Sequence, residues 1–249
     1  MTCSLFIWGQ TSPGGAHACP DEERLRELLH VLQASYAVVY QPIQATDPKL
    51  TEAGEAAGML QLGFDAVEEL RAGILAENAK SALRQCGFAS DQSDSWPRMQ
   101  AMEDVACAGG AWLCGGDGGM RQWVGYLAAY EGAAFSEDGH RGWVREYLDG
   151  HVSLMRQLPG LQALQVHRHL DWLPEGVVSH APWLLRNSVH FCSREALASA
   201  LQSPVRDRMF AHRQQCLPEI GRSFHGAVRA TGVGVARTAG VASTHARNP

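Results

Sequence analysis

A single histidine, His151, stands among aromatic and aliphatic residues in a stretch with helical periodicity. Intervals of three and four residues place these side chains on one face of a predicted helix: Trp143, Tyr147, Leu148, His151, Leu154 and Met155. Burial disfavours the charged form of an imidazole, so this ring would be neutral and able to accept a proton near pH 7. His151 is therefore a candidate general base. The same pattern also fits a core histidine that hydrogen-bonds a carbonyl group or Tyr147.

Two later stretches predict strands that carry further histidines. Alternation puts three polar residues of the first strand on one face: Gln165, His167 and His169. It does the same on the second strand: Arg186, Ser188 and His190. If these faces coincide, the histidines could line a cleft that meets the helix of His151; a solvated sheet face is the alternative. His-x-His is also a spacing that metals use, but no carboxylate stands at a matching short interval, so we expect no metal site.

The bulk composition excludes several classes of protein. The chain has 249 residues, of which 45% are hydrophobic and 19% charged, enough for a substantial core. A net charge of -5 without a long basic run argues against nucleic acid or an anionic membrane as partner. The N-terminus does not resemble a signal peptide, and no segment approaches the ~18 apolar residues of a membrane span. We expect a cytoplasmic protein that binds a small molecule.

The elements that would position these residues follow one order twice. In the first half we expect a strand at 4–10, a helix from residue 21, strands at 36–43 and 59–64, and a second helix after the N-cap candidate Asp65. Residues 86–120 look irregular, with a helix-like piece at 99–105, a strand candidate at 111–114 and a glycine cluster at 115–119. The second half repeats this order, with a strand at 123–130, a helix at 140–158, strands at 161–170 and 184–191, and a helix after the N-cap candidate Ser193. It adds a short helix at 205–216 and a final edge strand at 226–236.

Each half therefore follows the order β-α-β-β-α with an optional last strand, which is the ferredoxin-like plan. One such sheet leaves a face uncovered, and two sheets from one chain can cover each other. We predict an α+β protein of two ferredoxin-like units with antiparallel sheets, residues 1–115 and 120–237, packed as an intrachain pseudo-dimer. Residues 238–249 would be a flexible tail, and the whole chain could pair again as a homodimer.

The stretch YLDGHVSLMRQLPGLQALQVHR resembles the signature region of the EthD family of dimeric α+β-barrel proteins. The resemblance extends through VHFCSREALASALQSPVRDRMFAH, which is similar to EthD-like proteins that include methylmuconolactone methyl-isomerases, and it covers about residues 122–235. It implies that the two units close into a barrel, with a cofactor-free pocket between helices and sheet.

The resemblance places the helix histidine of the isomerase-like members at His151. Ser153 stands where a proline is common, and Val189 stands near the position of the isomerases' cysteine, which argues against thiol-assisted chemistry. The first half has no Leu-Pro-Gly, and His30 lies at the polar edge of its helix. We therefore expect one functional pocket, in the C-terminal unit, with the N-terminal unit as its tethered partner.

These observations favour a cofactor-free lyase, isomerase or cyclase that acts on a small cyclic, aromatic-derived or polyketide-like molecule. His151 would move the proton, and an enolate would be stabilised by one of three groups: Tyr147, His169 or His190. The other expected substrate contacts are Trp143, Tyr126, Tyr130, Met155 and His167. The alternatives are a haem-dependent or cofactor-independent monooxygenase of the same barrel superfamily, and a binding protein without catalysis.

Overall fold

The computed structural model describes residues 1–9, 19–44, 58–89, 97–108, 119–131, 137–170, 183–216 and 223–235. The first half supplies strands β1 (Cys3–Trp8), β2 (Tyr36–Pro42), β3 (Met59–Phe64) and β4 (Met99–Ala108). Its helices are α1 (Glu22–Leu32), α2 (Val67–Leu75) and α3 (Ala79–Gln85).

The second half follows the same order. Its strands are β5 (Arg121–Glu131), β6 (Leu161–His169), β7 (Trp183–Phe191) and β8 (Ser223–Gly234). A continuous helical segment joins β5 to β6 and consists of α4 (Glu137–Glu146), the π-helical turn η2 (Tyr147–His151) and α5 (Val152–Met155). Two further helices, α6 (Arg194–Leu201) and α7 (Pro204–Cys216), lie between β7 and β8.

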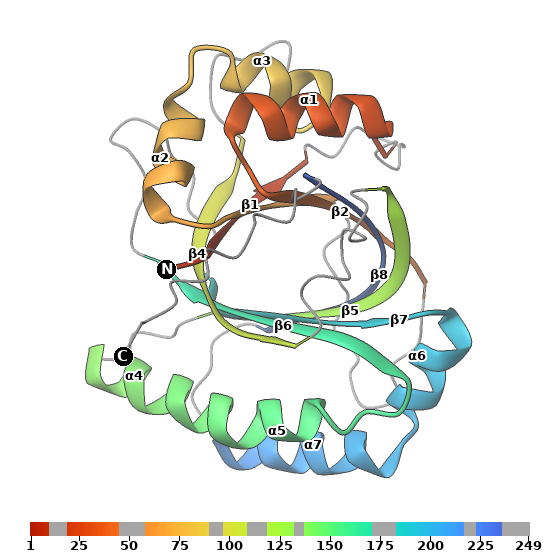
Figure 1. Cartoon of the computed structure of the whole chain (residues 1–249). Helices are drawn as coiled ribbons and strands as arrows, with labels where there is room; N and C mark the ends of the chain where they lie inside the picture. The colour runs from red at the N-terminus through yellow and green to blue at the C-terminus, as the bar shows by residue number, and fades with distance from the viewer. Residues whose placement is uncertain are drawn as a thin grey trace, which may run out of the picture.

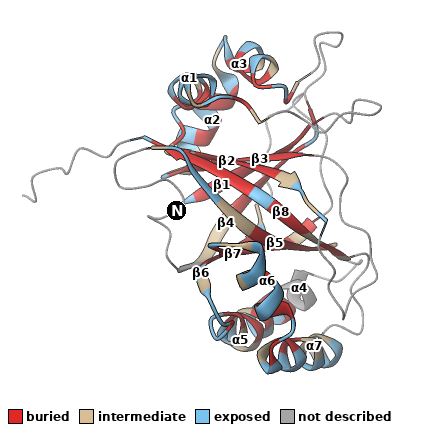
Figure 2. Ribbon diagram, turned by 90° about the vertical axis from the view of Figure 1, so that its right-hand side faces the viewer, coloured by how far each residue is buried: buried red, intermediate tan, exposed pale blue. Residues whose placement is uncertain are grey.

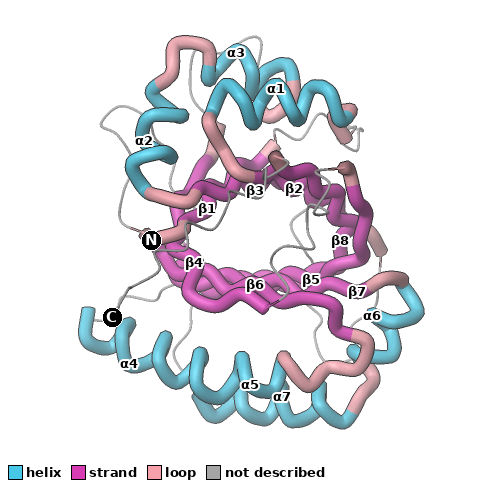
Figure 3. The backbone as a smooth tube through the Cα atoms, in the orientation of Figure 1, coloured by secondary structure: helices cyan, strands magenta, loops and turns pink. Residues whose placement is uncertain are grey.

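The eight strands form one closed antiparallel barrel in the order β1-β3-β2-β8-β5-β7-β6-β4. Each half has the ferredoxin-like order, and the two sheets join where β2 pairs with β8 and where β4 pairs with β6. Helices α1–α3 cover one side of the barrel and α4–α7 the opposite side (Figures 1 and 3). The predicted α+β fold of two ferredoxin-like units in a pseudo-dimeric barrel is confirmed.

Strand side chains alternate between the helix layers and the barrel interior, and both sides are buried (Figure 2). One apolar cluster lies between α1–α3 and the sheet, for example at Leu28 and Phe64, and a second lies between α4–α7 and the sheet, for example at Leu164. A third fills part of the interior, for example at Phe6 and Val38. The helix layer α4–α7 also encloses the pocket described below.

Local signals account for two of the helix starts. The Asp21 carboxylate accepts from the Arg24 N–H at 2.9 Å to cap α1, and the Ser193 hydroxyl accepts from the Ala196 N–H at 3.2 Å to cap α6. The expected cap at Asp65 was wrong. The N-cap of α2 is Ala66, and the Asp65 N–H instead donates to Glu69 Oε2 at 3.1 Å.

One predicted element was wrong, and one predicted strand was present but is not at an edge. The helix-like piece at 99–105 belongs to β4, because Met99 and Ala101 face the helix layer while Gln100 and Met102 face the interior. The predicted edge strand at 226–236 is β8, which pairs on both sides, with β2 and β5, and is no edge. The strand candidate at 111–114, the glycines up to 118 and the tail at 238–249 lie outside the described residues, so the boundary near 115–120 stays a prediction.

Gly63 allows a ring to lie flat across the sheet. It pairs with Tyr36 between β2 and β3, and an added Cβ would lie 2.0–2.5 Å from atoms of that ring. Gly63→Ala should therefore displace Tyr36 and lower the free energy of unfolding by about 1–3 kcal/mol in urea titrations. Gly142→Ala, where no atom lies within 4 Å of the added Cβ, is the control and should be neutral or stabilising. Equal effects of both changes would contradict this reasoning.

Candidate active site between helices and sheet

The predicted site residues fall on two sides of one sheet. Six lie on the side covered by α4–α7: Tyr126, Tyr130, Trp143, Tyr147, His151 and Met155. His167, His169 and His190 are on the inner side, where the predicted polar faces do coincide, with His167 opposite Arg186. The hypothesis of one cleft shared with His151 is wrong, because the backbone of the sheet separates the two groups. The alternation of side chains along the strands could predict that these histidines share one face of the sheet. It could not predict which face of the sheet the helices would cover.

A pocket that opens to solvent lies between the helices and the outer faces of β5, β7 and β8; its empty space, counted together with the solvent at its mouth, is about 480 Å³. Its walls are mostly aromatic and aliphatic, as in many small-molecule sites. Its polar lining consists of Tyr126, Tyr130, Tyr147, His151, Asn187, Arg206, Arg213 and His225. Trp143 does not line it, but supports it from behind by contacts with Tyr130 and Tyr147, at ring-centroid distances of 5.9 and 5.5 Å.

The π-helical turn η2 brings His151 onto Tyr147. The two rings stack with centroids 4.7 Å apart and an interplanar angle of 29°, and such turns are frequent at functional sites. Gly150 in the same turn makes room for α7, since a Cβ there would lie 2.1 Å from Nε2 of His212. The His212 ring consequently packs 5.5 Å from that of His151.

His151 is neutral in this setting. Burial lowers its pKa to about 3, and the neighbouring side chains of His212, Arg206 and Arg213 act in the same direction. The side chain is 3% exposed, and its Nδ1 has no hydrogen-bond partner among the described residues. In the tautomer protonated at Nε2, Nδ1 therefore offers a lone pair inside a desolvated site.

Tyr147 is held as a neutral phenol beside His151. Burial raises its pKa well above the ordinary value, and the neighbouring Tyr130 adds to that effect. Its oxygen accepts from Asn187 Nδ2 at 2.6 Å, while its hydroxyl points to the Met155 sulfur at 3.9 Å. A thioether is a weak acceptor, and the Tyr130 side chain also hydrogen-bonds Tyr147, so a ligand would compete with both for the Tyr147 hydroxyl.

The sequence-based prediction missed Asn187 and the two arginines. Asn187 interrupts an otherwise apolar strand face, Leu185-x-Asn187-x-Val189, and that break was its signal. Arg206 and Arg213 stand seven residues apart on α7 with Met209 between them, so all three share one helix face and all line the pocket. Arginines at core-facing positions are uncommon, but the sequence of α7 has no apolar stripe that would mark this face as buried.

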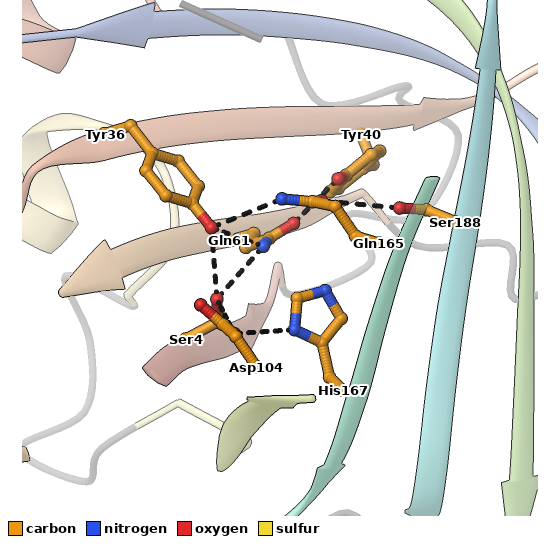
Figure 4. Close-up of polar contacts among 8 residues, drawn as sticks. All are labelled: Ser4, Tyr36, Tyr40, Gln61, Asp104, Gln165, His167 and Ser188. Carbon is orange, nitrogen blue, oxygen red and sulfur yellow. Dashed lines mark hydrogen bonds and ion pairs between the residues drawn. The ribbon is translucent and has the colours of Figure 1, made fainter. Parts of the chain in front are cut away.

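The barrel interior holds a separate polar network (Figure 4). The Asp104 carboxylate accepts from Ser4 Oγ at 2.9 Å and lies 2.8 Å from His167 Nδ1. Gln61 Nε2 donates to Ser4 Oγ and to the Tyr36 hydroxyl, at 3.1 and 3.0 Å. These contacts join β1–β4 to β6, so the network fastens the two halves together.

The other two inner histidines, His169 and His190, also contact side chains inside the barrel. His169 Nδ1 lies 2.9 Å from Gln100 Nε2. The His190 ring is fully buried and stacks on Tyr40, with centroids 6.1 Å apart.

Among the described residues no group of three or more His, Cys, Asp or Glu side chains could hold a metal ion. No described helix is long and apolar enough to cross a membrane.

Comparison with known proteins shows the fold. No family model matches the sequence, and neither does any curated protein. An anthrone oxidase-like protein superposes over 96% of this chain and 95% of its own, with a TM-score of 0.54 and 14% identity. The chain shares its barrel fold. A candidate monooxygenase from Fusobacterium nucleatum covers 94% of this chain and 95% of its own, with a TM-score of 0.52 and 5% identity.

An EthD family protein from Bacillus halodurans aligns with 42% of this chain and 96% of its own, with 19% identity and a TM-score of 0.34. The barrel fold that the sequence resemblance implied is present in this one chain, as its strand order shows.

Proposed function

We propose that the chain is an enzyme that moves a proton on a small cyclic or aromatic molecule bound in the pocket between helices and sheet. The observation that carries this proposal is His151, whose ring is neutral, buried and lacks a partner at Nδ1 among the described residues. A general base must keep its lone pair until substrate arrives, and these surroundings achieve that.

The proposed reaction begins next to a carbonyl group. His151 Nδ1 takes a proton from the adjacent carbon, and the electron pair of the broken C–H bond moves to the carbonyl oxygen to give an enolate. The Tyr147 hydroxyl donates a hydrogen bond to that oxygen. The imidazolium then returns the proton to a different carbon, which is an isomerisation, or to a leaving oxygen, which is an elimination. His169 and His190 have no part in this scheme, because they face the barrel interior.

A deuterium-exchange screen over three classes of carbonyl compound tests the proposal. Cyclic ketones, unsaturated lactones and hydroxyaromatic ketones are incubated with the protein in D2O, and incorporation is followed by NMR and mass spectrometry. We expect enzyme-dependent exchange at the carbon next to the carbonyl group, reduced in Tyr147→Phe. Absence of exchange across the three classes, or exchange unchanged in His151→Ala, would refute it.

The cofactor-independent oxygenase alternative shares the first step, since a carbanion formed in the pocket could react with O2 instead of a proton. Oxygen consumption measured in the same screen separates the two outcomes. The isomerase or lyase proposal expects exchange without oxygen uptake.

A further inference from the structure

Three polar side chains from three different elements meet in the wall of the pocket. Asn187 lies on β7, Tyr147 on η2 and Tyr130 on β5, and each is at most 5% exposed. Asn187 Nδ2 donates to the Tyr147 oxygen at 2.6 Å, and the Tyr130 side chain hydrogen-bonds both of the others. The two phenol rings meet edge to face, with centroids 5.5 Å apart. The three side chains therefore form one hydrogen-bonded group that lines the pocket.

The backbone fixes where the amide of Asn187 lies. Strand β7 is paired on both sides, so Asn187 stands opposite Ala128 of β5 and Val166 of β6. Side chains two residues apart along a strand share a face, which puts Tyr130 on the same side of the sheet as Ala128. The amide is thus held at the Tyr147 oxygen by a strand that its neighbours fix on both sides.

A count of protons shows what this group can offer a ligand. The amide nitrogen of Asn187 has hydrogens and no acceptor capacity, so it donates to Tyr147. Burial raises the pKa of both phenols, so each keeps its hydroxyl proton at pH 7. The bond between the phenols uses one of these two protons. The other is left for a third group, and the acceptor that the structure gives it at Tyr147, the Met155 sulfur 3.9 Å away, is weak.

We propose that Asn187 and Tyr130 are positioning residues that direct the Tyr147 hydroxyl proton at a negatively charged oxygen of the substrate. The inference rests on the proposed function, because that oxygen is the enolate oxygen of the same reaction. In this arrangement the Tyr147 oxygen accepts from Asn187 and from Tyr130, while its hydroxyl donates to the ligand. Each accepted bond polarises the hydroxyl and makes it a stronger donor.

This arrangement selects ligands by the charge on their oxygen. A hydrogen bond to an anion is roughly twice as strong as one to a neutral oxygen. The Tyr147 hydroxyl therefore favours enolates and phenolates over neutral molecules of the same shape.

Phenols that lose their proton on binding imitate the enolate and serve as probes. 4-Nitrophenol and 4-nitro-1-naphthol are titrated against the protein and compared with their methyl ethers, which have nearly the same shape and cannot ionise. The absorption spectrum of a bound nitrophenol distinguishes the phenolate from the phenol. We expect at least one phenol to bind as its anion, about tenfold more tightly than its ether. Tyr147→Phe should remove most of that preference.

A double-mutant cycle separates positioning from a merely structural role. Asn187→Leu and Tyr130→Phe should each lower the preference for the phenolate about fivefold in an otherwise wild-type chain. Neither should lower it further in the Tyr147→Phe background, because both act through the Tyr147 hydroxyl. An unaltered affinity for the ether shows that the pocket of a variant is intact. Where Asn187→Leu disturbs the pocket, Asn187→Asp takes its place, since it keeps the shape and replaces the donor by an acceptor.

Tyr40→Phe is the matched control, because it removes a similarly buried hydroxyl, bonded to Gln61 at 2.7 Å inside the barrel. It should keep the wild-type preference, and a loss equal to that of Tyr130→Phe would overturn the proposal. So would the absence of phenol binding at up to about 20 mM, ethers that bind as tightly as phenolates, or equal effects of the two changes with and without the Tyr147 hydroxyl. Deuterium exchange that persists alongside any of these results would leave the proposed proton transfer standing. Phenolate binding that follows the cycle without any deuterium exchange would refute only the catalysis.

Discussion

Replacement of His151 by alanine is expected to lower kcat/KM for deuterium exchange by about 100- to 10,000-fold, the usual contribution of a positioned general base. Its ring is neutral at pH 7 and has a nitrogen without a hydrogen-bond partner among the described residues, beside the phenol of Tyr147. Added imidazole should restore part of the rate, because the truncated side chain leaves a space beside Tyr147.

His30→Ala is the control for this experiment. His30 is exposed in the last turn of α1, and α1 covers the side of the barrel opposite the pocket (Figure 1). Its removal should leave exchange unchanged. His151→Gln, which largely keeps the side-chain volume, guards against a folding defect in the alanine variant. Full activity in both His151 variants would contradict the assignment.

Acidification from pH 7 to pH 5 is expected to destabilise the fold strongly through its buried histidines. Burial lowers the pKa of His190, inside the barrel, from 6.5 to about 3, and that of His151 to about the same value. The unfolded chain therefore binds protons first as the pH falls. Stability that is full above about pH 6.5 is lost progressively toward pH 3, at about 2 kcal/mol per histidine between pH 7 and pH 5.

Urea unfolding curves at several pH values measure this effect. His190→Asn removes one titrating ring, so its unfolding free energy should fall less steeply with acid than that of the wild type, even if the variant is less stable at pH 7. His30→Asn replaces an exposed surface histidine; it is the control and should keep the wild-type slope. Equal slopes for all three proteins would contradict this prediction, because they would mean that folding does not lower the pKa of His190.

The sequence predicted the fold well because the order of elements repeats and helix and strand periodicities are distinct in most segments. It failed at β4, where Met99, Met102 and Val105 imitate helical spacing. Met99 to Met102 are buried on both faces of the strand, and an irregularity between Asp104 and Ala106 shifts the pairing, so no clear alternation remains. Helix α3 was missed as well. The predicted homodimer stays a prediction.

The candidate site was only half predictable. The helix face that holds Tyr147, His151 and Met155 follows from spacing alone, and these side chains do line one pocket. The inner histidines share a face, as alternation requires, but alternation does not say on which side of the sheet the helix of His151 packs. The positive end of the pocket was missed because α7 has no apolar stripe to mark its buried face, and its two arginines look like ordinary surface residues.

The most direct test of the central claim is a crystal structure of the protein with the compound that exchanges fastest in D2O. The ligand is expected between the helices and the sheet, against Tyr130 and Tyr147, with its reacting carbon within reach of His151 Nδ1. A ligand found inside the barrel beside His167 or His190, or one bound away from His151, would contradict the account.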